Sequence, residues 1–253
     1  MSSEITTIIF SKNRACQLEL LLRSLNMPAT VLYTYDPAFG SGYDKLIKMY
    51  PDVRFVFETA FKAQMVEYMG KYSGEYVMFL VDDDVMIEPF KEYDPLFEEF
   101  KKNQDIICLS LRLAPHYQGA PAFKNNTWEW RGLKHDWGYP MSVSANIFRK
   151  RDILPTMSSG SFDMPNDLEV LLRKNPPRKP LMICADKPNI INVPANLVQT
   201  KYRPNRFKNM GIPVEDINKK FLSGFRISLE DIVGKARSSK NCFLVTDYKY
   251  ENY

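Results

Sequence analysis

Strand-like apolar runs alternate with runs of helical periodicity through the first 113 residues, and this alternation constrains the fold more than any other feature. The expected strands are 5–10, 30–36, 53–58, 75–81 and 105–113, and the expected helices are 14–25, 43–49, 60–72 and 95–102. In the first of these helices Leu18, Leu22 and Leu25 recur at helical spacing. Strands that alternate with helices form parallel βαβ units, so we expect a mostly parallel sheet covered by helices.

The alternation becomes less regular in the second half of the chain. Residues 114–141 hold both histidines and all three tryptophans among several Pro and Gly, which favours loops and short antiparallel strands. The later segments are expected to be a strand and then a helix in 140–154, a helix at 165–174, strands at 180–185 and 189–193, and helices near 214–222 and 228–237. We therefore expect one α/β domain over 1–200 with a mixed second half. A helical C-terminal extension, 201–253, is expected to pack on the same domain.

Composition places the chain among ordinary globular proteins, with 45% hydrophobic and 25% charged residues. The formal net charge of +4 is too mild to argue for nucleic acid, and no nucleic-acid partner is expected. The distribution of charged residues along the chain is more informative, because 76–105 carries nine acidic and three basic residues whereas 149–240 carries nine acidic and eighteen basic. An acidic metal site and a basic surface for an anionic ligand or a membrane would both fit, and so would solvated helix faces.

The four cysteines, which stand far apart in the sequence, have no metal-ligand spacing and suggest no disulfide framework. A reducing compartment is the simpler interpretation. The opening "MSSEITTIIFSKNR" has only a short apolar run and does not resemble a signal peptide, and no stretch approaches the roughly 20 apolar residues of a membrane span. We expect a cytoplasmic protein without a transmembrane segment, for which peripheral membrane contact stays open.

Three carboxylates follow one of the expected strands without a break. "GEYVMFLVDDDVMIEP", residues 74–89, carries Asp82, Asp83 and Asp84 between two apolar runs that hold them near the core. Adjacent carboxylates repel each other, and ligands of open α/β sheets bind at the carboxyl ends of strands. Hard oxygen ligands in that position suit Mg²⁺ or Mn²⁺, whose charge would relieve the repulsion. The alternative is a plain acidic turn after a strand.

Several phosphate-binding motifs are absent from the sequence. It has no G-x-x-x-x-G-K-[ST], which excludes a P-loop, and no G-x-G-x-x-G after its first strand, which argues against a dinucleotide fold. In a phospho-aspartate hydrolase we would expect Thr or Val where this chain has Met86.

Five segments together resemble the metal-dependent sugar-nucleotide glycosyltransferases of the GT-A fold, particularly family 2-like enzymes. They are "TIIFSKNRACQLELLLRSL", Asp36 at the end of the second strand, "YVMFLVDDDVMIEP", "SVSANIFRKRDIL" and "NDLEVLLR". The resemblance covers roughly residues 5–200. It implies a Rossmann-like, mostly parallel sheet with helices on both faces. It also implies transfer of a sugar from a nucleoside-diphosphate sugar to a glycan, a lipid-linked acceptor or another hydroxyl.

The resemblance also implies roles for the acidic strand ends. Asp36 would contact the nucleotide base, Asp82 the ribose, and Asp84, with Asp82, the metal ion that holds the diphosphate. Asp83 would do either or face away. The cofactors implied are Mn²⁺ or Mg²⁺ with a UDP-sugar as the first choice of donor and a GDP-sugar as the second.

Four basic residues are candidates for binding the nucleotide or its diphosphate. Arg14 and Lys62 are within expected reach, and for each of them a surface charge is the alternative. Arg203 and Arg206 lie in the basic segment "QTKYRPNRFKNMG", 199–211, which we expect to fold over the diphosphate. A solvated loop is the alternative for this segment.

The resemblance places the catalytic base at Asp167, although Asn166 stands where the family usually has Glu. The alternative is a helix-start acid favoured by the helix dipole. In the implied mechanism a cation stabilises the leaving diphosphate, and a carboxylate on the opposite face takes the acceptor proton, which inverts the anomeric centre. A non-catalytic glycan- or nucleotide-binding protein on the same scaffold is the main functional alternative. A nucleotidyltransferase, whose Gly-rich phosphate loop is not found, is the third.

Overall fold

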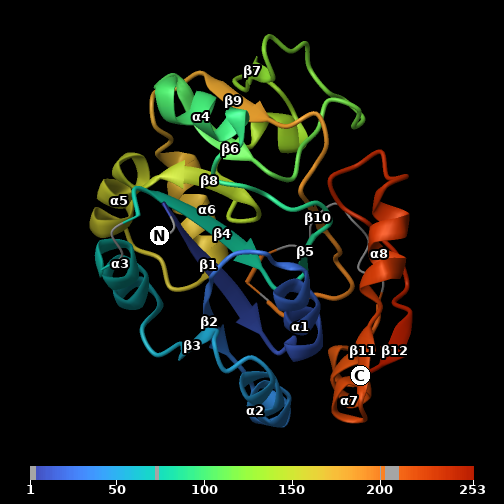
Figure 1. Ribbon diagram of the computed structural model, residues 1–253. Coiled ribbons are helices and arrows are strands. Elements are labelled where there is room, and N and C mark those ends of the chain that lie inside the picture. Colours follow the sequence, from blue (N-terminus) through green and yellow to red (C-terminus); the bar gives the residue numbers. More distant parts are fainter. Residues whose placement is uncertain (1–3, 72–73, 200, 203–210) are drawn as a thin grey trace.

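The computed structural model describes residues 4–71, 74–199, 201–202 and 211–253. Its centre is an eight-stranded sheet in the order β3-β2-β1-β4-β8-β6-β9-β7 (Figure 1). The strands of this sheet are β1 (Ile5–Lys12), β2 (Thr30–Thr34), β3 (Arg54–Phe57), β4 (Tyr76–Val81), β6 (Ile106–Ser110), β7 (Thr127–Glu129), β8 (Asn146–Arg149) and β9 (Leu181–Cys184). Strands β1 to β4 are parallel to one another, as are β6 and β9, whereas β8 is antiparallel to both β4 and β6. The predicted α/β class with a mostly parallel sheet is confirmed.

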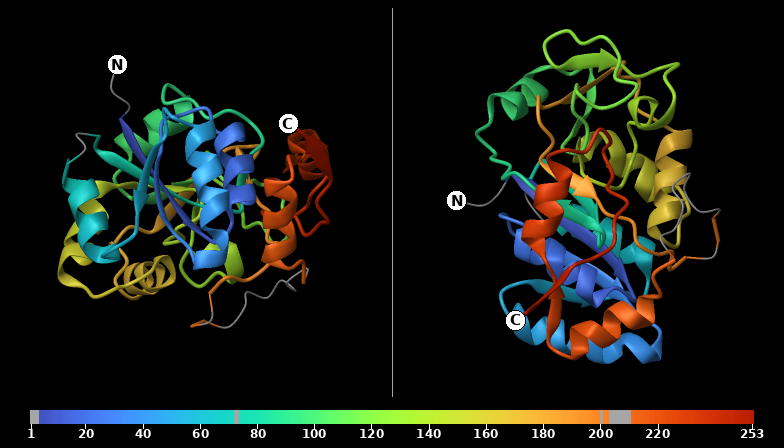
Figure 2. Two further views of the ribbon diagram at one scale, coloured as in Figure 1. Left: turned by 90° about the horizontal axis from the view of Figure 1, so that it is seen from below. Right: turned by 90° about the vertical axis from the view of Figure 1, so that its right-hand side faces the viewer.

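Helices cover both faces of this sheet, as predicted. They are α1 (Ala15–Ser24), α2 (Gly40–Met49), α3 (Phe61–Lys71), α4 (Pro95–Lys102), α5 (Lys150–Ser159), α6 (Pro165–Lys174), α7 (Val214–Leu222) and α8 (Leu229–Ala236), with short 3-10 turns η1 (Pro37–Phe39) and η2 (His135–Gly138). Side chains of β1 alternate between two cores: Ile9 belongs to the core that holds residues of α1, α2, α4 and α7, and Ile8 belongs to the core that holds residues of α3, α5 and α6. Figure 2 shows the two helical layers from below and from the side.

Local sequence explains where several helices begin. Asp94 precedes α4 and accepts a hydrogen bond from the backbone N of Leu96 at 2.8 Å, and Pro95 occupies the first helical position. Pro165 likewise opens α6 and places Asp167 in its first turn, as predicted. Ser228 caps α8 by accepting from the backbone N of Asp231.

Two small antiparallel pairs lie outside the main sheet. The apolar run after the three aspartates forms β5 (Asp84–Met86), which pairs with β10 (Ile190–Asn192) so that Asp84 faces Asn192 in register. The second pair joins β11 (Phe225–Ile227) to β12 (Tyr250–Asn252) near the C-terminus. Neither β5 nor the β11–β12 pair is expected from the sequence pattern, because three-residue strands carry too little periodicity.

The C-terminal elements contact α1 and α2. Helix α7 packs against both helices, and β11 packs against α1. Lys45 on α2 donates to the backbone O of Phe221 at 2.6 Å, and Arg23 on α1 donates to the backbone O of Ile227 and lies 3.2 Å from the Glu251 carboxylate. These polar contacts join two parts of the chain that lie about two hundred residues apart.

Candidate functional site

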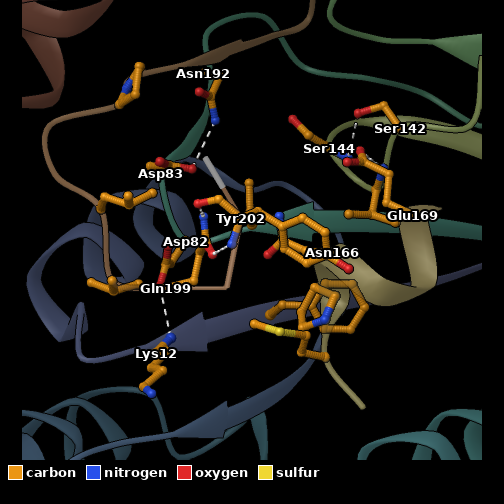
Figure 3. Close-up of a pocket in the computed structure, with 18 of the residues that line it drawn as sticks. Lys12, Asp82, Asp83, Ser142, Ser144, Asn166, Glu169, Asn192, Gln199 and Tyr202 are labelled. Carbon is orange, nitrogen blue, oxygen red and sulfur yellow. Dashed lines mark hydrogen bonds between the residues drawn. The ribbon is translucent and has the colours of Figure 1, made fainter. Parts of the chain in front are cut away.

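A cavity of about 1210 Å³, here called the main cavity, opens at the carboxyl ends of β1 to β4. Its lining from these strand ends includes Ser11, Lys12, Thr34, Glu58, Val81 and Asp82. The opposite wall comes from 142–144 before β8 and from one face of α6. In Figure 3, Asp82 and Asp83 lie at one side of the pocket and Glu169 lies at the other. The carboxyl edge of parallel strands is where open α/β sheets bind their ligands.

Asp82 lies on the floor of the main cavity and is 4% exposed. Its Oδ2 accepts hydrogen bonds from Ser11 Oγ at 2.9 Å and from the backbone N of Lys12 at 3.1 Å, and its Oδ1 accepts from Arg14 Nη1 at 2.9 Å. Burial raises the pKa of Asp82 to about 6, although the positive charge of Arg14 opposes that rise. The side chain is therefore fixed by three donors before any ligand binds.

Asp83 presents its carboxylate to the main cavity and is held at both oxygens. Oδ2 accepts from Arg14 Nη1 at 3.2 Å, and Oδ1 accepts from Asn192 Nδ2 at 2.9 Å. Its backbone O also accepts from the N of Val193 at 2.7 Å. The guanidinium of Arg14 thus lies between the carboxylates of Asp82 and Asp83, and its positive charge offsets the repulsion between them. Burial would lower the pKa of Arg14, but the two carboxylates keep it above its ordinary value.

Asp84 is fully buried and does not line the main cavity. It accepts from the backbone N of Val81 at 3.0 Å, from Ser144 Oγ at 2.8 Å and from Asn192 Nδ2 at 3.0 Å. Burial raises the pKa of Asp84 to about 7, and the nearby charge of Asp83 adds to the rise. The carboxylate thereby fastens β5 to β10 and to the turn before β8. Asp84 is expected from the sequence to ligate a metal ion; its carboxylate is held by these three donors, whereas Asp83 lines the main cavity beside Asp82.

Asp36 and Lys62, which are predicted to contact the nucleotide, do not line the main cavity. Asp36 is exposed, accepts from Asn13 Nδ2 at 2.6 Å and does not line the main cavity. Lys62 on α3 is also absent from the lining. The cavity wall near these positions is made by Thr34 and by Glu58, which follows β3 as Asp82 follows β4. Because Glu58 directly follows a parallel strand, its position in the sequence could have indicated that it lines the ligand site. Burial raises its pKa.

Arg14 lines the main cavity, as expected for a ligand-binding residue, and its charge is already engaged by Asp82 and Asp83. Its guanidinium also donates to the side chain of Asn196 at 2.8 Å and to the backbone O of that residue. Arg203 and Arg206 lie outside the described residues. Of the predicted basic segment, Gln199 and Tyr202 contribute to the cavity wall.

Helix α6 carries two acids, and they face different spaces. Asp167 lines a smaller cavity of about 280 Å³, where Lys201 Nζ lies 2.7 Å from its Oδ1 and 2.8 Å from its Oδ2, and where Tyr202 also donates to it. Burial would raise the pKa of Asp167, but these donors outweigh it and hold the pKa below its ordinary value. The main cavity is instead lined by Asn166 and Glu169. The expected base position is thus occupied by an ion-paired carboxylate outside the main cavity.

Glu169 is the acid of α6 that sequence reasoning does not single out. Its Oε1 accepts from the backbone N of Val143 at 3.1 Å, and Tyr139 and Ser142 also hydrogen-bond to it. Burial raises the pKa of Glu169 despite these donors. Helical geometry could have indicated that only one of the two acids faces the ligand, because positions 167 and 169 differ by roughly 200° around a helix and cannot face the same space.

The acidic strand end is a candidate place for a cation to bind, because two carboxylates meet there at the main cavity. Within 4–71, 74–199, 201–202 and 211–253 no three His, Cys, Asp or Glu side chains converge to hold a metal ion. Mg²⁺ and Mn²⁺ sites that bridge to phosphates need only one or two carboxylates, and Asp83 with Asp82 provides them. Asp83 and Asp82 are therefore the residues at the main cavity that could hold a cation.

Comparison with known proteins gives one curated relative. The chain is 31% identical over 186 residues to the bifunctional glycosyltransferase pgtA of Dictyostelium discoideum, a match that spans 59% of this chain and 24% of the relative. The chain is similar to a glycosyltransferase. The resemblance to glycosyltransferases inferred from the motifs is thus confirmed, while the chain spans about a quarter of the length of this relative. No family model matches.

Solved structures provide more distant likenesses. Glucosyl-3-phosphoglycerate synthase from Mycobacterium tuberculosis, in complex with Mn²⁺ and uridine-diphosphate-glucose, aligns with a TM-score of 0.43 and 10% identity over 98% of this chain and 86% of its own. A cytidylyltransferase from Leptospira borgpetersenii aligns with a TM-score of 0.43 and 13% identity over 68% of this chain and 71% of its own. Among the described residues, no helix combines the length and the apolarity that crossing a membrane requires.

Proposed function

We propose that this protein is a glycosyltransferase that moves a sugar from a nucleoside-diphosphate sugar to a hydroxyl acceptor, with a divalent cation as cofactor and with inversion. The single observation that supports this most is the main cavity itself. It joins two carboxylates and an arginine at a parallel strand end to a separate carboxylate on α6 (Figure 3). The similarity to a glycosyltransferase over 59% of the chain supports the same proposal.

The strand-end side of the cavity is assigned to the donor. Asp83 and Asp82 would hold the cation, which when bound acts as a Lewis acid on the diphosphate. Arg14 is fixed between the two carboxylates and can present its remaining donors to phosphate oxygens if Asn196 moves. Thr34 and Glu58 lie further along the strand ends, where they are placed to contact the nucleoside. A UDP-sugar is the first donor to test and a GDP-sugar the second.

The α6 side is assigned to the acceptor, which we take to be a glycan or a lipid-linked sugar. A carboxylate there must accept the hydroxyl proton from the face opposite the leaving diphosphate. We place the protein in the cytoplasm, where sugar nucleotides are available, and we propose that residues 201–253 pack on the same domain as 1–200.

Turnover of a panel of nucleotide sugars tests the proposal directly. The protein is incubated with UDP- and GDP-sugars, with Mn²⁺, with Mg²⁺ or with a chelator, and release of nucleoside diphosphate is measured. We expect cation-dependent release with at least one donor, and a product of inverted anomeric configuration by NMR. Cation-dependent binding without release would favour the non-catalytic binding protein. Release of pyrophosphate from a nucleoside triphosphate would favour a nucleotidyltransferase.

A further inference from the structure

The two acids of α6 flank its buried stripe on opposite sides. Leu168 and Leu172 are buried in the core with α3 and α5. Asp167 precedes Leu168 by one position and Glu169 follows it by one, so each side chain is turned by roughly 100° from the buried stripe, in opposite directions. The packing of the leucines thereby sends Glu169 to the main cavity and Asp167 to the smaller one.

Glu169 lies where an acceptor hydroxyl would have to approach. It lines the main cavity on the side away from Asp82 and Asp83, as the labelled residues of Figure 3 show. A carboxylate has about four acceptor sites; the backbone N of Val143 donates to Oε1 of Glu169 at 3.1 Å, and the side chains of Tyr139 and Ser142 also interact with the carboxylate. These contacts fix the orientation of the carboxylate and leave capacity to accept one more hydrogen bond.

Asp167 has the opposite properties. Its carboxylate is engaged by Lys201 and Tyr202, and it receives a further bond from the backbone N of Asp163 at 3.3 Å. Three donors that stabilise the charged form make a carboxylate a weaker base. Tyr202 lines both cavities, so the contact with Asp167 also fixes a part of the wall of the main cavity.

We infer that Glu169 is the general base of the proposed transfer reaction and that Asp167 is a positioning residue, which holds Lys201 and Tyr202 at the edge of the main cavity. This inference rests on the proposed function. The acceptor hydroxyl gives its proton to a carboxylate oxygen of Glu169, and its oxygen forms the new bond to the anomeric carbon. The bond from that carbon to the diphosphate breaks, and its electron pair leaves on the diphosphate.

The charges around Glu169 suit this role. Tyr139, at the end of η2, hydrogen-bonds to the Glu169 carboxylate. Arg112, which follows β6, places a positive charge near this carboxylate. Arg173, which lies on α6 like Glu169, lies over the ring of Tyr139. The cations favour the charged carboxylate, whereas burial favours the neutral acid and has the larger effect, so the pKa of Glu169 is raised. A raised pKa brings a carboxylate closer to the pH at which a general base is most effective.

The test compares Glu169→Gln with Asp167→Asn in the steady-state assay of the active wild-type protein. Glu169→Gln should lower kcat by roughly 10²–10⁴-fold and remove the acidic limb of the kcat/KM pH profile. Affinity for the nucleoside diphosphate, measured by calorimetry, should stay within about twofold of wild type, because the donor side is untouched. Asp167→Asn should cost no more than about tenfold in kcat and should keep the acidic limb.

Three further variants test whether Asp167 is a positioning residue or a base masked by its partners. If Asp167 only positions Lys201 and Tyr202, then Lys201→Met and Tyr202→Phe should reproduce part of the loss seen with Asp167→Asn. If the two side chains instead mask a base, these variants should raise kcat, and that would overturn the inference. Glu230→Gln, which removes an exposed acid on α8, is the matched control for loss of a glutamate charge.

The inference and the proposed function fail in different ways. An Asp167→Asn loss equal to or larger than that of Glu169→Gln, with turnover by the wild type, overturns the assignment of the base and leaves the proposed function standing. Wild-type protein that turns over no sugar nucleotide refutes the proposed function and the inference with it.

Discussion

The guanidinium of Arg14 lies 2.9 Å from the carboxylate of Asp82 at the floor of the main cavity, and both side chains are less than a tenth exposed. The same nitrogen reaches Asp83 at 3.2 Å. A buried pair of this kind is costly to break, because the remaining charge has neither water nor a partner. Arg14 therefore makes it possible for two consecutive carboxylates to stay near the core and still face a ligand.

Removal of this guanidinium should destabilise the fold. We expect Arg14→Met to lower the free energy of unfolding by about 3–5 kcal/mol, the usual cost of an unpaired buried charge. Denaturant unfolding followed by circular dichroism measures the change. The double variant Arg14→Met with Asp82→Asn should regain much of the loss, because no carboxylate is then left unpaired at position 82. Equal stability of the single and double variants would show that the unpaired Asp82 carboxylate is not the source of the loss.

Asp83 and Asp84 should respond differently to substitution. Asp83→Asn should weaken cation-dependent binding of a nucleoside diphosphate by about tenfold or more, because it removes the carboxylate that reaches the cavity beside Asp82. Asp84→Asn, the matched control, keeps the size and an acceptor oxygen and should retain that binding. Calorimetry with UDP, with and without Mn²⁺, measures both. Loss of the Mn²⁺ effect in Asp84→Asn alone would restore Asp84 as the metal ligand.

Truncation of the buried aspartate should affect folding rather than binding. Asp84→Ala leaves the donors at Val81, Ser144 and Asn192 without their acceptor, which should cost about 1–3 kcal/mol of stability. The urea midpoint reports the loss. A variant as stable as wild type would mean that water replaces the carboxylate.

The contact between Asp167 and Lys201 should depend on pH. The donors at Lys201 and Tyr202 lower the pKa of Asp167, so the native state binds this proton more weakly than the unfolded chain does. The resulting stabilisation is present above the ordinary pKa of 3.8 and is lost as the pH falls through the lowered native-state value. The stability difference between wild type and Asp167→Asn should therefore shrink between neutral pH and about pH 3. A difference that grows on acidification would contradict this sign.

The C-terminal elements should unfold together with the sheet. Phe221 on α7 is fully buried in the core that contains α1 and α2, so Phe221→Ala should lower stability by about 3–5 kcal/mol. Phe225→Ala provides the control, because that ring is 40% exposed and its loss should cost much less. Fluorescence and circular dichroism should give one coincident transition in each variant. Two separate transitions would show that 211–253 forms a unit of its own.

The order of helices and strands in this chain could be predicted from the sequence because it depends on local periodicity. The apolar alternation of the first 113 residues and the acids that end β4 are properties of short segments, and the parallel sheet follows from them. The short strand β5 and its pairing with β10 could not be predicted in this way. The two strands lie about a hundred residues apart in the sequence, and β5 is too short to show a period of its own.

Which carboxylates face the cavity was decided only by tertiary structure. Asp84 is turned inward because Ser144 and Asn192, 60 and 108 residues away, meet it there. On α6, the sequence shows two acids on either side of a buried leucine stripe, and by symmetry either could face the ligand. The rotation of α6 against α3 and α5 breaks that symmetry and directs Glu169 to the main cavity. A helix can be predicted from its own residues, but the space that each of its faces meets depends on the partners it packs against.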